Sequence, residues 1–158
     1  MKKLLFVVCM LGLLLFLARE KAPEYTHEVV PQPPELVVTV TEGSVTEHYT
    51  CNWSYLDENG QERTLGLTPG MREDWWNQTP QLVTADQTAR LSFALPPDEM
   101  TVSRYSVTDG SSTFCELTEE GELPLIPGSW TYVFMAQWTD ETRPYHGWAK
   151  YIVCIGKN

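Results

Sequence analysis

Catalysis by a serine or cysteine nucleophile needs a base within hydrogen-bond reach, and three histidines are available for that role. His27 lies in a proline-rich segment, His48 has outward parity at the start of a strand pattern, and His146 falls in a loop between two strand patterns. The chain has no GxSxG nucleophile elbow, no HExxH zinc motif and no glycine-rich phosphate loop. The sequence therefore predicts a protein that is not an enzyme. A hydrolase whose catalytic residues are brought together only by the fold is the remaining catalytic alternative.

Metal binding is suggested by one short run, DENGQE, which begins at Asp57. A calcium loop of the EF-hand kind needs a glycine at its sixth position and a glutamate at its twelfth. Here Gly60 is the fourth residue and Thr68 is the twelfth. The run is therefore predicted to be a plain hairpin turn, and we expect no metal and no cofactor.

Aromatic rings are the remaining chemical resource, because an exposed ring can stack on a ligand or pack into an interface. Five rings fall on the inward parity of strand patterns and are assigned to the core: Trp53, Trp130, Tyr132, Trp138 and Tyr151. Others lie in irregular segments or flank a loop. The candidate ligand contacts are Trp75, Trp76, Tyr145, His146 and Trp148. For the adjacent pair Trp75 and Trp76, the alternative is that one ring closes an open edge of the fold.

The elements that must position these residues are short strands with period-two alternation. No run of ten or more residues shows helical periodicity after the first segment. The expected strands are Leu36–Thr41, Glu47–Tyr55, Gln61–Leu67, Ala89–Leu95, Met100–Tyr105, Phe114–Leu117, Trp130–Trp138 and Trp148–Ile155. This spacing predicts an all-β protein, an antiparallel immunoglobulin-like β-sandwich of about seven strands.

The first segment differs from the rest of the chain. Lys2 and Lys3 precede an apolar run from Leu4 to Ala18, a pattern typical of an export signal. We expect residues 1–18 to be an apolar helix that serves either as a cleaved signal peptide or as an uncleaved signal anchor. Residues 19–35 are rich in proline and predict an extended stalk, and residues 36–158 form the β-sandwich domain.

The charge balance excludes some partners. The chain has 11 basic and 21 acidic residues. Residues 1–19 contain three of the basic residues and no acidic residue, which leaves a formal charge of −13 on the remainder. An acidic exterior domain repels phosphate backbones and anionic lipid headgroups. We therefore expect no nucleic-acid partner, and membrane contact only through the N-terminal segment if it is uncleaved.

Three cysteines lie beyond the first segment: Cys51, Cys115 and Cys154. Export would allow a disulfide. The odd number leaves at least one thiol free or paired between chains, and the sequence does not choose among the three possible pairs.

Four motifs in order carry a resemblance to a known family: CNWSY from Cys51, ARLSFALPPDEMTVSRY from Ala89, IPGSWTYVFMAQW from Ile126 and HGWAKYIVCI from His146. Over Leu36 to Ile155 the chain resembles an immunoglobulin-like domain of exported, largely uncharacterised proteins of Gram-positive gut bacteria. The resemblance implies a β-sandwich at the cell exterior, sometimes attached to a membrane sensor or peptidase, and it implies no catalytic residue.

Together these observations predict a non-enzymatic extracytoplasmic module, membrane-anchored or secreted, that binds a protein, cell-wall or glycan partner. The alternative is a structural or accessory subunit, or a spacer, of a membrane-associated assembly.

Overall fold

The computed structural model describes residues 27–47, 49–67 and 75–158, and the regular elements in these ranges are all strands. In chain order they are β1 (Leu36–Val40), β2 (Gly43–Glu47), β3 (Tyr49–Leu56), β4 (Glu62–Leu67), β5 (Leu82–Thr84), β6 (Thr88–Phe93), β7 (Glu99–Ser106), β8 (Ser112–Cys115), β9 (Leu123–Pro124), β10 (Gly128–Trp138) and β11 (Tyr145–Lys157).

The strands form two sheets. The four-stranded sheet has the order β2-β1-β6-β9. The seven-stranded sheet has the order β4-β3-β11-β10-β7-β8, with β5 added to β11. Every pairing between the described strands is antiparallel except β5 with β11. The predicted all-β class is confirmed. Three of the eleven strands in the described ranges were not predicted: β2, β5 and β9. Strand β5 has three residues and β9 has two, too few to show alternation, whereas the five residues of β2 were missed between two predicted strands.

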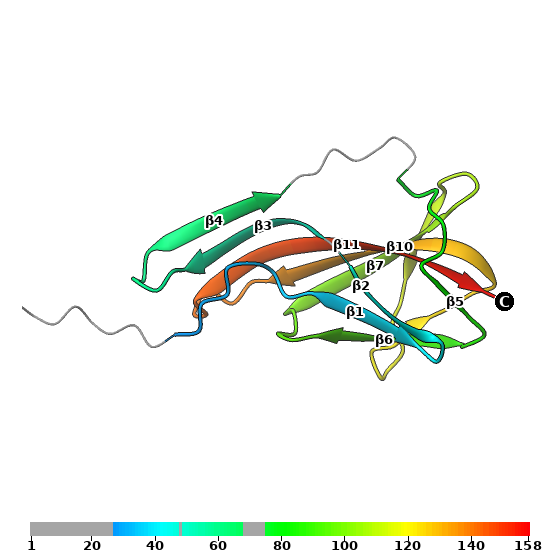
Figure 1. The fold of residues 1–158 in the computed structure, drawn as a ribbon, viewed down its shortest axis with the longest axis horizontal. Helices are drawn as coiled ribbons and strands as arrows, with labels where there is room; N and C mark the ends of the chain where they lie inside the picture. Colours follow the sequence, from blue (N-terminus) through cyan, green and yellow to red (C-terminus); the bar gives the residue numbers. More distant parts are fainter. Residues whose placement is uncertain (1–26, 48, 68–74) are drawn as a thin grey trace, which may run out of the picture.

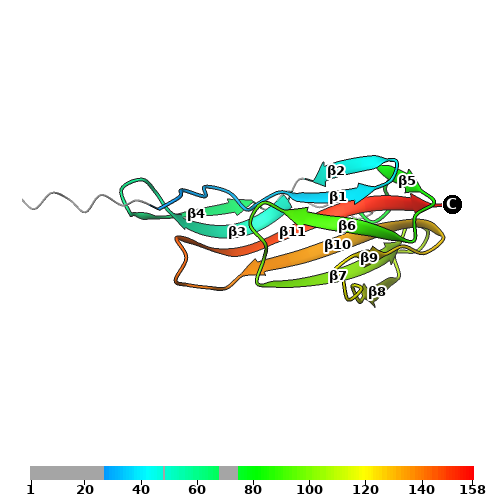
Figure 2. The same ribbon diagram turned by 90° about the horizontal axis from the view of Figure 1, so that it is seen from below.

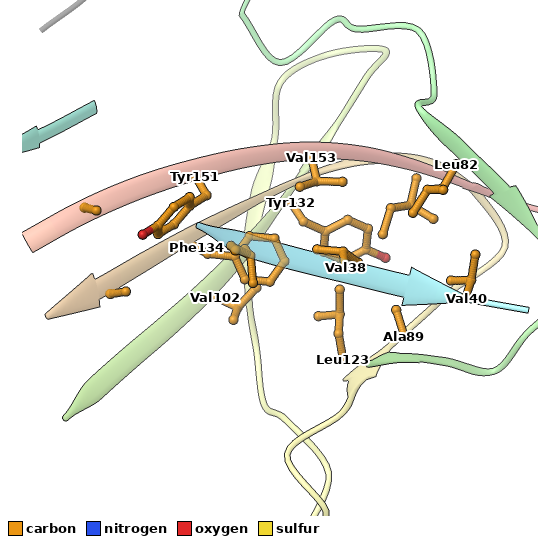
Figure 3. Close-up of a cluster of buried hydrophobic side chains, with 14 of the residues drawn as sticks. Val38, Val40, Leu82, Ala89, Val102, Leu123, Tyr132, Phe134, Tyr151 and Val153 are labelled. Carbon is orange, nitrogen blue, oxygen red and sulfur yellow. The ribbon is translucent and has the colours of Figure 1, made fainter. Parts of the chain in front are cut away.

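The two sheets lie one over the other, as Figures 1 and 2 show from two directions. One hydrophobic cluster fills the space between them. In Figure 3, Val38 of β1 lies in the same cluster as Tyr151 of β11, Phe134 of β10 and Val102 of β7, which form one cross-strand row of the larger sheet. Burying a side chain of this size contributes about 1.5–3 kcal/mol, so these inward rows hold the layers together.

The long hairpin of β10 and β11 is the centre of the seven-stranded sheet. Its register runs from Gly128 opposite Lys157 to Trp138 opposite Gly147. Of the five rings assigned to the core from sequence, four are at most 1% exposed: Trp53, Tyr132, Trp138 and Tyr151. The fifth, Trp130, is half-buried against the cluster, and its indole Nε1 donates to the Pro127 carbonyl at 3.1 Å.

The proline-rich segment before β1 packs on this domain where the structure describes it, over residues 27–35. The Trp53 Nε1 donates to the Val30 carbonyl at 2.8 Å, and the Tyr151 hydroxyl donates to the Pro34 carbonyl. Buried indole and phenol groups need such partners. The folded part therefore begins before Leu36, and residues 27–35, expected to be stalk, are part of it. The expected signal at 1–18 and the rest of the expected stalk, 19–26, lie outside the described residues.

Within the described ranges, no helix is long and apolar enough to span a membrane.

Candidate functional site

The outer face of the seven-stranded sheet is the surface that points away from the four-stranded sheet. In β11 the inward residues Ala149 and Tyr151 are fully buried, so the alternate residues Trp148 and Lys150 face outward. Trp148 is 37% exposed and is the most exposed tryptophan in the described ranges.

Two amide side chains stand beside Trp148. Its direct cross-strand neighbours are Gln137 on β10 and Asn52 on β3. Directly opposed residues of antiparallel strands share a face and have Cβ atoms about 4.5–5.5 Å apart. The outer face therefore presents an indole ring between two groups that each donate and accept hydrogen bonds. Sequence reasoning found Trp148 but missed both amides, because their proximity depends on long-range register.

Trp75 lies on the same outer face. Its ring centroid is 4.6 Å from that of Tyr105 on β7, and the Lys150 Nζ lies 5.2 Å from its ring. Between the sheet rows of Tyr105 and Lys150 lies the row of Val133, which is only 8% exposed. Trp75 is thus a half-buried ring that contacts Tyr105 on β7 and Lys150 on β11.

Trp76 is used for packing. The buried Thr131 hydroxyl donates to the Trp76 carbonyl at 2.6 Å. The Trp76 ring lies against Gly110. A Cβ atom added at Gly110 would lie 2.7 Å from the Trp76 ring carbon Cε2. We call residues 75–81 the strap, because both of its ends are bound to the outer face of the sheet. Trp76 makes the contacts at one end. At the other end the Gln81 side-chain oxygen accepts from the Cys154 amide at 2.7 Å.

Tyr145 faces the other way. It stacks on Trp53 with ring centroids 5.5 Å apart and planes at 19°. Trp53 in turn meets Trp138 edge to face at 5.2 Å. Tyr145 therefore extends the core, whereas Trp148 remains on the surface.

His146 shares the outer face with Trp148 and lies near a serine and a carboxylate. Its Nε2 is 3.9 Å from the Glu62 carboxylate, and both side chains are largely exposed. Ser54 is its cross-strand neighbour, but the Ser54 hydroxyl is 3.4 Å from the Thr64 hydroxyl and hydrogen-bonds with it. A catalytic serine would bond to the imidazole in a site that excludes water. This arrangement is a solvated surface ion pair when His146 is protonated.

The other described histidine, His27, is engaged with the backbone: its Nε2 lies 3.1 Å from the Leu56 carbonyl oxygen. His48 lies outside the described residues.

The loop between β10 and β11 is fixed by Asp98 from the β6–β7 connection. Its carboxylate accepts from the Thr139 amide at 2.8 Å and the Asp140 amide at 3.2 Å, and it pairs with the Arg143 guanidinium at 2.8 Å. The amide hydrogen bond from Thr139 is the main cause that lowers the Asp98 pKa below its usual value. These contacts tie the loop that precedes Tyr145 and His146 to the β6–β7 connection.

Asp57 occupies a turn, as the sequence indicated. Its carboxylate accepts from the amides of Asn59 at 2.9 Å and Gln61 at 3.0 Å and pairs with Arg63 at 2.9 Å. The Gln61 amide is the main cause that lowers the Asp57 pKa. In the part of the chain that the structure describes, no group of three or more His, Cys, Asp or Glu side chains could hold a metal ion.

A polar cleft of about 450 Å³ opens at the β1, β6 and β9 side. Its carboxylates already have partners. Asp86 accepts from the Thr41 amide at 2.6 Å, and Glu122 accepts from the Thr88 hydroxyl at 2.6 Å and pairs with Arg90 at 3.3 Å. The two carboxylates of the cleft are therefore engaged by donors of the protein itself.

No disulfide joins Cys51, Cys115 and Cys154 within the described residues. Cys51 is paired with Ala149, so Cys154 lies about 17 Å further along β11. Cys154 also faces the opposite side, where its thiol contacts the Gln78 carbonyl. Cys115 lies on β8, three strands from β11 and four from β3, which is about 14 Å or more. Disulfides need Cα atoms about 4.4–6.8 Å apart, so the fold places no two of these cysteines within reach of each other.

The outer face around Trp148 therefore combines an accessible ring, two amides and a fixed neighbouring loop. Comparison with protein-family models, curated proteins and solved structures finds no match to this chain. The function must be inferred from these residues and their surroundings.

Proposed function

We propose that this chain is a non-catalytic extracytoplasmic module with an immunoglobulin-like β-sandwich fold, and that it binds an uncharged saccharide, such as a cell-wall glycan, on the outer face around Trp148. The observation that supports the proposal most directly is the exposure of Trp148 on a regular strand. The other large rings of the β10–β11 hairpin are buried or half-buried.

The neighbours of Trp148 fit a sugar. The apolar face of a pyranose ring packs against a flat aromatic ring, and its hydroxyl groups both donate and accept hydrogen bonds. Gln137 and Asn52, one on each side of Trp148, offer the complementary groups. The sheet places all three on one surface without a loop that must first become ordered.

The charge of the molecule favours a neutral ligand. The chain beyond residue 19 has a formal charge of −13. Glu99 pairs with Gln137 in the register, in the same cross-strand row as Trp148, and Glu62 lies beside His146. Like charges reduce the local concentration of an anionic ligand, so acidic polysaccharides are poor candidates.

A non-catalytic role is supported by the contacts of the described histidines. His27 meets a backbone carbonyl, and His146 meets an exposed carboxylate. Export is supported by the apolar pattern of residues 1–18 and by the resemblance to exported immunoglobulin-like domains.

The test is isothermal titration calorimetry of the full chain, solubilised in mild detergent, with a tetramer of N-acetylglucosamine as the neutral probe. We expect saturable binding that is about tenfold weaker in Trp148→Ala and largely kept in Trp148→Phe. A tetramer of galacturonic acid should bind more weakly. Phe114→Ala, on the far edge of the same sheet, is the matched control and should leave the titration unchanged.

Unchanged binding in Trp148→Ala would place the saccharide elsewhere. Absence of binding across neutral wall and glycan oligosaccharides would reject the saccharide. A stoichiometric protein cross-linked through position 148 in native cells would instead favour the accessory-subunit alternative.

A further inference from the structure

Strand β8 ends the seven-stranded sheet on the side opposite β4. Its residues Ser112–Cys115 include no charged residue, no proline and no glycine. Other edge strands carry features that discourage further pairing: β4 has Glu62 and Arg63, β9 has Pro124, and β2 ends on Glu47. Strand β5 is also an edge, since among the described strands it pairs only with β11, but it has three residues against the four of β8.

The hydrogen-bond pattern identifies which backbone groups of β8 face outward. The Ser106 amide donates to the Ser111 carbonyl at 2.9 Å, so the Ser111 carbonyl points toward β7. Backbone groups in an antiparallel pair point alternately toward and away from the partner strand. Thr113 therefore faces β7, whereas the N–H and C=O groups of Ser112 and Phe114 face away from the sheet.

A large apolar side chain stands at this edge. Phe114 is 80% exposed, the highest value for a large hydrophobic residue in the described ranges. It pairs with Ser103, which lies on the outer face with Tyr105. An exposed ring beside outward backbone groups is the combination that strand addition uses, because the backbone gives affinity and the side chains give selectivity.

The charges around β8 define the partner. Asp109 precedes the strand, Glu116 follows it, and Glu119 and Glu120 lie in the next turn, all four exposed. The basic residue beside the strand is Arg104, opposite Thr113, and its guanidinium lies 5.5 Å from the Trp130 ring. The four exposed carboxylates outnumber this one positive charge, so a basic partner is favoured.

We infer that β8 accepts an extended peptide segment of another protein as an additional strand, and that this segment has alternating apolar residues and basic flanks. A second copy of this chain fits less well, because it would bring two acidic surroundings together over only four residues. The site is distinct from the proposed saccharide surface: β7 and β10 separate β8 from β11, about 14 Å.

The probe is a blocked heptapeptide, Lys-Val-Thr-Val-Thr-Val-Lys, with a matched version in which glutamate replaces both lysines. Amide hydrogen exchange is measured by NMR on the full chain in mild detergent. We expect the basic peptide to slow exchange at Ser112 and Phe114 at least fivefold and to leave Thr113 unchanged, because the Thr113 amide already faces β7. The acidic peptide should bind at least tenfold more weakly.

Ser112→Pro removes an outward N–H without removing a bond to β7, and proline is tolerated at such edge positions. It should weaken peptide binding about tenfold, and Phe114→Ser should weaken it about threefold. The matched control is Thr64→Pro on the other edge strand, β4. The Asp57 amide donates to the Gln61 carbonyl, so the backbone of Gln61 points toward β3. Counting alternately along β4 from Gln61, the backbone groups of Thr64 point away from β3, as those of Ser112 point away from β7.

Slower amide exchange at Thr64 or around Trp148, in place of slower exchange at Ser112 and Phe114, would overturn the inference. So would the absence of protection at millimolar peptide, equal binding of the acidic peptide, or equal loss in Thr64→Pro. Concentration-dependent protection of Ser112 and Phe114 without any peptide would indicate self-pairing and would also overturn it. Trp148→Ala should leave peptide binding intact, so failure of the saccharide proposal and failure of this one are distinguishable.

Discussion

At the scale of single residues, the buried aromatic rings show how the interior accommodates polar atoms. The indole nitrogens of Trp53 and Trp138 donate to the carbonyls of Val30 and Leu95 at 2.8 and 3.1 Å. The Tyr132 hydroxyl is buried deeply enough that desolvation raises its pKa to about 12. An unpaired buried donor costs about 1–3 kcal/mol. The two indole hydrogen bonds therefore allow Trp53 and Trp138 to be buried without that cost.

The cysteines give a prediction at this scale. Alkylation of the folded chain by a maleimide should modify Cys115 and leave the buried Cys51 and Cys154 intact. The reaction should be slower than that of an unstructured cysteine, because burial raises the Cys115 pKa and reduces the thiolate fraction. Mass spectrometry before and after denaturation checks both statements.

Under mild oxidants that keep the chain folded, no disulfide should form among these three cysteines within one chain. A bridge between any two of them in a chain with native far-ultraviolet circular dichroism would contradict the spacing derived from the strand register.

At the scale of elements, the strap depends on a glycine in the turn between β7 and β8. Gly110 has φ +70, and a Cβ there would lie 2.7 Å from the Trp76 ring. Gly121 has φ +77, but a Cβ added there would have no neighbouring atom within 4 Å. Gly121→Ala should therefore cost about 1 kcal/mol from backbone strain alone, and Gly110→Ala about 2–3 kcal/mol because the ring must also move.

Urea denaturation of the two variants measures the difference. Equal losses would mean that Trp76 adjusts freely and that the strap does not depend on this contact. When Gly110→Ala is made in a Trp76→Ala background, its effect on the free energy of unfolding should fall to about that of Gly121→Ala, about 1 kcal/mol, because no ring has to move.

The same elements show how far sequence reasoning reaches. The alternation in β10 and β11 correctly predicted the burial of Trp138 and Tyr151, because a strand of that length has one inward face. Extending the β11 pattern back to Tyr145 would have placed that ring inward as well. The amides beside Trp148 could not be found, since they depend on how β11 aligns with β3 and β10. Strand β9, with Pro124, has no local signal and forms only because β6 lies beside it.

At the scale of the whole molecule, acidic side chains stabilise many of the connections. Five aspartates accept hydrogen bonds in turns and have a lowered pKa: Asp57, Asp86, Asp98, Asp109 and Asp140. Because the folded pKa is lower than the unfolded value of 3.8, the folded state binds fewer protons than the unfolded state in this range. The stabilisation is complete well above pH 3.8 and is lost as the pH falls through the lowered values.

The melting temperature should therefore fall steeply between about pH 5 and pH 2.5. Asp98→Asn should melt lower than the parent at about pH 7, and the gap should narrow as the pH drops, because the parent loses the same charge. Differential scanning calorimetry measures both curves. A gap that stays constant with pH would show that ionisation of Asp98 is not the source of its effect.

The ends of the described chain lie at opposite ends of the long axis, and the strands run along that axis (Figures 1 and 2). A pull between His27 and Asn158 is therefore directed along β11, which is paired with β10, β3 and β5. Such a load acts in shear on many backbone hydrogen bonds at once, whereas a pull across the sheet would open them one by one. We therefore expect the domain to resist unfolding under such a load, and force spectroscopy from these two attachment points measures that resistance directly.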